Sequence, residues 1–221
     1  MLSILLLGML IVKTIWYKPW ARYTYQTSVS TPQEFPIHLF GIWFSTKDNN
    51  YVGSFYQERE LINSFSSDWG KSRLSYNKRS EFLPETLFLE YVDFRTKNYY
   101  VDTIVLPKEK LKKSFQQINQ GKTRKGKKEI HVGIANDGNI VFWVVQHQKA
   151  IEFYSTTLQA KPFPEKIHAY GKPKIIKDKE EYIRQQFENI PDRKKTEILN
   201  KDVSEAEFKD SIPTYFEVIR K

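Results

Sequence analysis

Few side chains in this sequence stand at spacings that would support metal binding. Its four histidines are His38, His131, His147 and His168, and we identify no partner at metal-ligand spacing for any of them. His131 and His147 flank one predicted hairpin and could face each other across it. We therefore expect histidines that lie on the surface or pack within strands, and we predict no metal site.

Catalytic motifs are missing as well. Glu58 with Glu60 and Glu85 with Glu90 are carboxylate pairs, but such spacings arise in any chain with 26 acidic residues, and we interpret them as solvated surface. No G-x-S-x-G, P-loop or G-x-G-x-x-G motif is present. The sequence contains no Cys, which excludes a thiol nucleophile, thiolate metal ligands and disulfides. We therefore predict no catalytic residue and no cofactor, and we favour a protein that is not an enzyme.

One cluster of charge stands out. The net charge is +9, and nearly all of it lies between Leu106 and Lys128, a segment with nine basic residues and one acidic residue. Five of these cations could contact an anionic surface: Lys122, Arg124, Lys125, Lys127 and Lys128. The alternatives are a solvated loop, anionic lipid headgroups or an acidic protein partner. Nucleic acid is disfavoured because no aromatic residue is interleaved with these cations.

The sequence opens with an apolar run. Leu2–Tyr17 is broken only by Lys13 and is slightly shorter than the roughly 20 residues that cross a bilayer core. Trp16 and Trp20 resemble an interfacial aromatic belt. We predict that residues 1–21 form one projecting helix that serves as an uncleaved membrane anchor. A cleavable signal peptide and a buried first helix remain the alternatives.

The remaining residues, 22–221, are predicted to form a single α+β domain. We expect strands at 22–30, 37–45, 51–56, 86–94, 98–106, 129–136, 139–147 and 150–158. Apolar and polar residues alternate at 22–30 and 150–158, whereas residues 140–145 are apolar on both faces, as in a central strand. Turn residues such as Asp48-Asn-Asn50 and Asp137-Gly138 predict hairpins. We interpret Ser64–Phe82 as a loop, with one short strand within it as the alternative.

Helical periodicity is found in three places. Pro107–Gln120 carries Leu111, Phe115 and Ile118 on one face, which we expect to pack on the sheet. Further helices are predicted at 179–189 and 192–200. The predicted fold is thus a largely antiparallel β-sheet or sandwich of six to eight strands with one inserted helix, C-terminal helices and an N-terminal hydrophobic helix.

The order of several short motifs resembles a known family. These motifs are Val29–Ile37, Trp69-Gly70, Leu83–Leu87, Asn98–Tyr100, Leu106–Leu111, Val132–Gly138 and Val141–Trp143. Together they are similar to the bacterial domain-of-unknown-function family 2931, and they span Tyr23 to Phe163. The resemblance implies an envelope lipoprotein, but this sequence has no lipobox Cys, so we expect a peptide anchor instead. Members encoded near secreted lipase toxins suggest an immunity role by analogy.

We therefore expect a non-enzymatic binding protein that is tethered in the bacterial envelope and has a protein partner there. Its role would be toxin immunity or another interaction. The alternatives are an enzyme on an envelope substrate with a site not readable from sequence, and an anionic lipid-binding module. We expect the domain in the periplasm. Lys13, Lys18 and Arg22 would place it on the cytoplasmic face by the positive-inside rule, so that orientation stays open.

Overall fold

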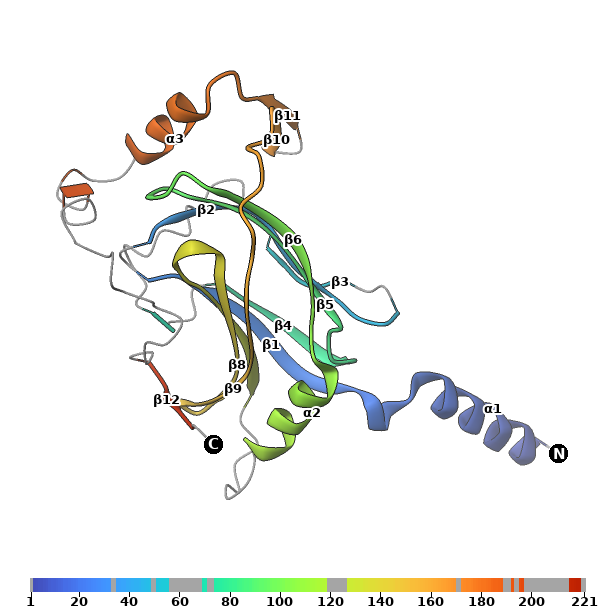
Figure 1. Ribbon diagram of the computed structural model, residues 1–221. Helices are drawn as coiled ribbons and strands as arrows, with labels where there is room; N and C mark the ends of the chain where they lie inside the picture. The colour runs from blue at the N-terminus through green and yellow to red at the C-terminus, as the bar shows by residue number, and fades with distance from the viewer. Residues whose placement is uncertain are drawn as a thin grey trace.

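The computed structural model is a sandwich of two β-sheets with helices at its ends (Figure 1). It describes residues 2–32, 35–48, 51–55, 69–70, 74–118, 127–169, 172–188, 192, 195–196 and 215–219. Helices and a mostly antiparallel sheet structure confirm the predicted α+β class.

The larger sheet has six strands. From edge to edge they are β12 (Glu217–Val218), β9 (Lys149–Thr157), β8 (Asn139–Gln146), β7 (Lys128–Ile134), β1 (Tyr23–Ser30) and β4 (Leu74–Glu81). β7, β8 and β9 pair in antiparallel order, which confirms the hairpin predicted at Asp137-Gly138. β1 pairs antiparallel with β4 and parallel with β7, so two strands distant in sequence lie side by side at the centre of the sheet.

The smaller sheet has four strands. In spatial order they are β3 (Tyr51–Phe55), β2 (Ile37–Ser45), β5 (Thr86–Asp93) and β6 (Tyr99–Val105). All its pairings are antiparallel, and both of the predicted hairpins, β2–β3 and β5–β6, are confirmed. A separate short hairpin is formed by β10 (Lys166–Ala169) and β11 (Lys172–Ile175).

The core lies between the two sheets. Alternate side chains of β1, β7 and β8 meet those of β2, β5 and β6 there, as expected when each strand turns one face inward. Helix α2 (Lys108–Gln117) closes one end, and its Leu111 and Phe115 are fully buried. The rings of Tyr23 and Tyr25 meet Phe115 edge-on, with centroids 5.5 and 6.0 Å away. The predicted packing face of this helix is therefore confirmed, with Ile118 partly buried beside it.

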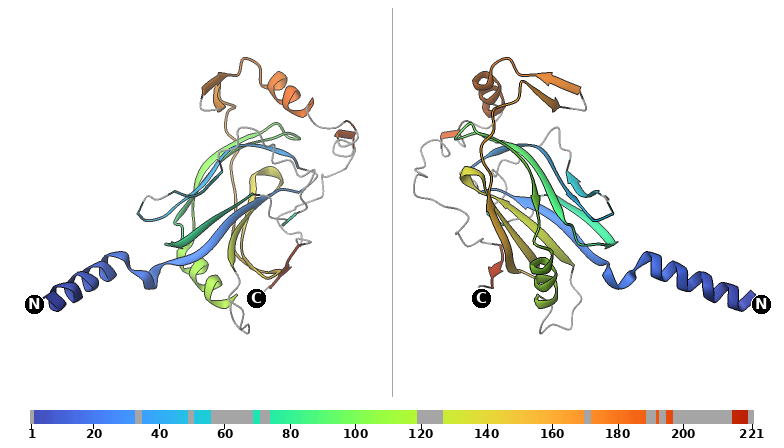
Figure 2. Two further views of the ribbon diagram at one scale, coloured as in Figure 1. Left: turned by 180° about the vertical axis from the view of Figure 1, so that it is seen from behind. Right: turned by 45° about the vertical axis from the view of Figure 1, so that its right-hand side comes forward.

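Helix α3 (Lys179–Glu188) covers the opposite end of the smaller sheet (Figure 2). Tyr182 and Ile183 are buried in a second, smaller core with Val92 and Phe94. The Tyr182 hydroxyl lies 2.9 Å from Nδ1 of His38, which ties the helix to β2. The predicted helix at 179–189 is confirmed, whereas the one at 192–200 lies mostly outside the described residues.

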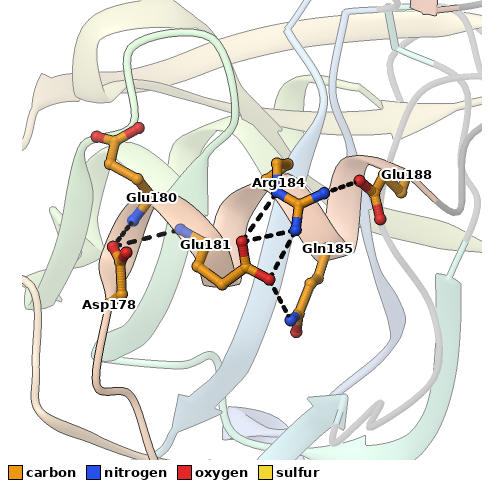
Figure 3. A network of polar contacts seen from close by, with 6 residues as sticks. All are labelled: Asp178, Glu180, Glu181, Arg184, Gln185 and Glu188. Carbon is orange, nitrogen blue, oxygen red and sulfur yellow. Dashed lines mark hydrogen bonds and ion pairs between the residues drawn. The ribbon is translucent and has the colours of Figure 1, made fainter.

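Charged side chains on the exposed face of α3 interact with one another and with the start of the helix (Figure 3). A carboxylate oxygen of Asp178 accepts the backbone N–H groups of Glu180 and Glu181 at 2.9 and 3.3 Å, which caps the helix. Arg184 pairs with Glu181 one turn before it and with Glu188 one turn after it. These contacts stabilise the helix.

Helix α1 (Leu2–Tyr17) projects away from the sandwich (Figures 1 and 2). Its apolar side chains are exposed on every side, from Leu6 to Trp16. The predicted projecting helix is confirmed over Leu2–Tyr17, but it ends before residue 21, because Lys18 turns left-handed with φ 47° and a 3-10 turn follows at Pro19–Ala21. Of the helices that the structure describes, none has the length and apolarity of a membrane-spanning segment.

Arg22 fixes the direction in which α1 leaves the domain. Its guanidinium lies between the rings of Tyr17 and Phe82, at 4.4 and 4.3 Å from their centroids. Its Nε donates to the Tyr17 carbonyl at 2.8 Å, and Nη1 pairs with Glu81 at 3.0 Å. Because Arg22 and Glu81 are largely buried, the junction is held by packing and charge together.

The structure contains more strands than the six to eight predicted, with twelve among the described residues. The additional strands are short or polar. β4, for example, lies in the segment interpreted as a loop and reads Leu74-Ser-Tyr-Asn-Lys-Arg-Ser-Glu81, without clear alternation. Its pairing with β1 supplies the order that its own sequence does not specify.

Candidate functional site

A cluster of polar side chains is buried on the outer face of the larger sheet. Glu129 and His131 lie two residues apart on β7, so both point to the same face of the strand. Ser28 and Ser30 occupy the matching face of β1, which runs parallel beside β7. His131 and both serines are fully buried, and Glu129 is 9% exposed.

The cluster forms one continuous hydrogen-bonded chain. Nδ1 of His131 lies 3.0 Å from Oε1 of Glu129, and Nε2 lies 2.7 Å from Oγ of Ser30. Ser30 Oγ also accepts the backbone N–H of Gly70 at 3.1 Å. The Ser28 hydroxyl donates to Glu129. Both ring nitrogens of His131 therefore have an oxygen partner, the Glu129 carboxylate at Nδ1 and the Ser30 hydroxyl at Nε2.

The pKa of Glu129 follows from this environment. Burial by itself would raise it, but the hydrogen bond and the electrostatic attraction from His131, together with hydrogen bonds from Ser28 and Gln26, outweigh burial and lower the pKa to about 2. Glu129 is therefore an ionised carboxylate throughout the physiological pH range, held by three donors in a largely buried position.

Aromatic rings cover the cluster. His131 packs against Trp143 and Phe216, each with its ring centroid 5.6 Å away. A Cβ atom on Gly133 would lie 2.5 Å from both the Trp69 and Trp143 rings, so only glycine allows them to approach this closely. The cluster thus has the connectivity of a serine–histidine–acid site without an open path to Ser30.

The cations predicted to contact an anionic surface are only partly described. Lys127 is exposed. The prediction that Lys128 belongs to a loop is wrong. Lys128 begins β7, and its ammonium donates to the Phe115 carbonyl at 2.7 Å. Burial lowers its pKa. Lys122, Arg124 and Lys125 lie outside the described residues.

A second polar feature lies where α1 joins the domain. The ends of several strands converge here: Lys47 follows β2, Glu85 precedes β5, Lys108 begins α2 directly after β6, and Tyr23 opens β1. Backbone hydrogen bonds of 2.8 Å from Glu85 N to the Ser45 carbonyl, and from Leu106 N to the Glu85 carbonyl, hold three of these ends together.

These ends enclose a pocket of about 250 Å³, which we call the junction pocket. It is lined by Trp20, Ala21, Tyr23, Lys47, Phe82, Leu83, Glu85, Lys108 and Lys112. Its lining is aromatic and aliphatic, while three lysines and one carboxylate supply its charge. Lys108 pairs with Glu85 at 2.7 Å, and the Lys47 ammonium lies 4.0 Å above the Phe82 ring.

The remaining sequence candidates are dispersed. His147 sits exposed in the turn after β8, and its predicted approach to His131 is wrong because His131 faces Trp143 across the hairpin. Glu90 accepts the Tyr99 hydroxyl at 2.7 Å and is remote from the Glu85–Lys108 pair. Within the described ranges, no three acidic or histidine side chains converge as a metal site would require. Glu58 and Glu60 lie outside those ranges.

Sequence reasoning missed both sites for identifiable reasons. The Glu129–His131 spacing was a usable signal, since residues two apart on a strand share a face. Their serine partners could not be found without the parallel pairing of β1 and β7. The junction pocket has no sequence motif because its lining comes from strand ends, the turn after α1 and the start of α2, which meet only in the folded chain.

One comparison with known proteins, a match to a protein family, covers nearly the whole chain. The family described as "Protein of unknown function (DUF2931)" matches residues 15–218. No curated protein and no solved structure matches the chain.

Proposed function

Taking as a premise that the chain belongs to the family DUF2931, we propose that it is a non-enzymatic binding protein held at a membrane of the bacterial envelope by α1. The observation that carries this proposal is the exposure of α1. Leu10 and Val12 are 61% and 59% exposed, and Trp16 is 85% exposed, on a helix that projects from the sandwich.

An apolar helix that is exposed on every side requires another apolar environment. The helix has sixteen residues, a length of roughly 24 Å at 1.5 Å per residue. Trp16, Tyr17 and Trp20 follow in order at its domain-proximal end, where an interface would favour aromatic rings. The contacts of Arg22 with Tyr17 and Glu81 support the same role, because a tether that is fixed in direction also orients the domain it carries.

Substituting Leu7→Asp together with Leu10→Asp should lower binding of the full chain to phosphatidylcholine vesicles by at least about 100-fold. Each acidic residue in the middle of a lipid-inserted helix costs about 2.5–3.5 kcal/mol. Vesicle flotation measures the bound fraction. The matched control is Ile175→Asp with Ile219→Asp, which changes exposed apolar residues of the domain by the same charge. Equal binding of the two double variants would refute the tether.

A second candidate is an enzyme that acts on an envelope substrate, and the Ser30–His131–Glu129 chain favours it. Its hydrogen bonds run from a hydroxyl to Nε2 and from Nδ1 to a carboxylate, the order used to activate a serine nucleophile. Our leading proposal treats the chain as structural, because Ser30 is 0% exposed and already accepts the Gly70 N–H.

An alkyl fluorophosphonate separates the two candidates, because it labels serines that are both activated and accessible. We expect no labelling of Ser30 in the intact protein, measured by mass spectrometry of tryptic peptides. Ser30→Ala serves as the control for labelling elsewhere. Labelling of Ser30 that disappears in His131→Gln would make the enzyme the better proposal.

The binding role that we propose is toward a protein in the envelope. Toxin immunity is one form of it, supported only by the resemblance to family members encoded near secreted toxins. Domain placement in the periplasm is part of the same proposal. In-cell crosslinking of the full chain, with the α1 double variant for comparison, would identify partners that depend on the tether.

A further inference from the structure

We propose that the junction pocket binds the phosphate of an anionic phospholipid headgroup. The proposal rests on the tether proposed above and adds a specific lipid site to it. It differs from the predicted contact through the loop at 122–128, because the pocket uses Lys47, which follows β2, and Lys108 and Lys112 of α2.

Position is the first argument. The pocket is lined by Trp20 and Ala21, the turn that directly follows α1. Trp20 is 66% exposed and lies four residues beyond Trp16. When α1 is inserted in lipid, this turn lies at the boundary between acyl chains and headgroups, where Trp residues are enriched. The pocket therefore lies at the depth of the lipid phosphates.

Charge is the second argument. Lys47, Lys108 and Lys112 line the pocket against one carboxylate, Glu85. Lys108 is already paired with Glu85, and no residue that the structure describes forms an ion pair with Lys112 or Lys47. Lys112 is therefore available to an anion, Lys47 can donate to one from its position above the Phe82 ring, and Lys108 can share its donors between Glu85 and a phosphate oxygen.

Shape is the third argument. The pocket's floor includes the buried rings and side chains of Phe82 and Leu83 and the half-buried Tyr23. A volume of about 250 Å³ is below the roughly 300–1,000 Å³ of clefts that enclose drug-sized ligands. An apolar floor with a cationic rim suits a glycerol phosphate whose acyl chains remain in the bilayer.

The test compares full chains on phosphatidylcholine vesicles with and without phosphatidylglycerol. We expect the wild type to prefer phosphatidylglycerol, by about fivefold for each contributing lysine, since one basic side chain near an anionic leaflet is worth about 1 kcal/mol. Lys47→Gln, Lys108→Gln and Lys112→Gln together should remove most of this preference. Lys110→Gln, Lys113→Gln and Lys127→Gln together are the control, with the same change of charge at exposed positions outside the pocket.

A variant without any charge change sharpens the result. Ala21→Phe fills the pocket and should lower the phosphatidylglycerol preference at least fivefold, whereas Thr24→Phe adds the same ring to an exposed position outside the pocket. Equal losses in the two lysine triple variants, or an unchanged preference in Ala21→Phe, would show that only diffuse charge acts and would overturn the proposal.

Two further comparisons assign a failure to its cause. Binding to pure phosphatidylcholine should be unchanged in the pocket variants and lost in the α1 double variant, so the tether is tested independently of the headgroup site. Glycerol 3-phosphate should compete with the wild type for phosphatidylglycerol vesicles. If it binds the full chain in detergent micelles while vesicles show no preference, the ligand is a soluble phosphate and the lipid assignment is wrong.

Discussion

Replacing Glu129 with glutamine should destabilise the protein at neutral pH by about 3 kcal/mol and should remove part of its sensitivity to acid. The folded protein lowers the pKa of this carboxyl from 4.5 to about 2. A lowered folded-state pKa contributes stability above the unfolded value of 4.5, and this contribution is lost as the pH falls toward 2. At about 1.4 kcal/mol for each tenfold change in proton affinity, the loss is about 3 kcal/mol.

Urea unfolding followed by tryptophan fluorescence measures this effect, since Trp69 and Trp143 lie in the cover of the cluster. Glutamine resembles the protonated carboxyl, so the gap between wild type and variant should close as the pH falls. Burial raises the pKa of Asp93, so Asp93 changes the stability of the wild type with pH in the direction opposite to Glu129. The effect of Glu129 is therefore measured as the difference in free energy of unfolding between wild type and Glu129→Gln at each pH. Glu109→Gln, an exposed change on α2, is the control. A gap that stays constant with pH would contradict the assigned role of Glu129.

Leu111→Ala should lower the free energy of unfolding by about 2–5 kcal/mol. Leu111 is completely buried in the main core, on the face of α2 that closes the sandwich. Truncating a buried leucine removes apolar contacts and leaves a cavity that its neighbours fill only partly. Phe115 lies one turn away and is held by Tyr23 and Tyr25, which limits how far the helix can collapse into that space.

The appropriate control for this change is Lys113→Ala on the same helix. Lys113 is exposed, and alanine is an equally good helix former, so the free energy of unfolding should change by less than about 0.5 kcal/mol. Urea unfolding at neutral pH measures both variants. If Leu111→Ala also changed stability by less than that amount, α2 would not be packed as described.

The elements that the sequence predicted correctly are those with local signals. Pro107 and the spacing of Leu111 and Phe115 predicted α2, and Asp137-Gly138 predicted the β7–β8 hairpin. Asp137 adopts φ 53° and Gly138 φ 77°, the left-handed conformations that an Asp-Gly turn provides. Such features depend on neighbouring residues alone, and for this reason they can be predicted from a single sequence.

Features that depend on distant pairing could not be predicted. Alternation shows that Ser28 and Ser30 share a face of β1, but it does not specify which strand lies beside them. The Glu129–His131 site therefore became visible only through the register between β1 and β7. The junction pocket similarly combines Trp20 from the 3-10 turn after α1, Lys47 from the loop after β2 and Lys108 from the start of α2.

The parallel pairing of β1 with β7 also predicts an order in which the chain folds. Gln26 lies beside Glu129, 103 positions later, and the whole of the four-stranded sheet and α2 lies between them. Contacts between such distant segments form slowly, because a long loop must close before they are made. During synthesis β1 emerges early but has only β4 as a partner until residue 128 has followed. The four-stranded sheet, whose hairpins are local, can assemble first and then serve as the surface on which the larger sheet closes.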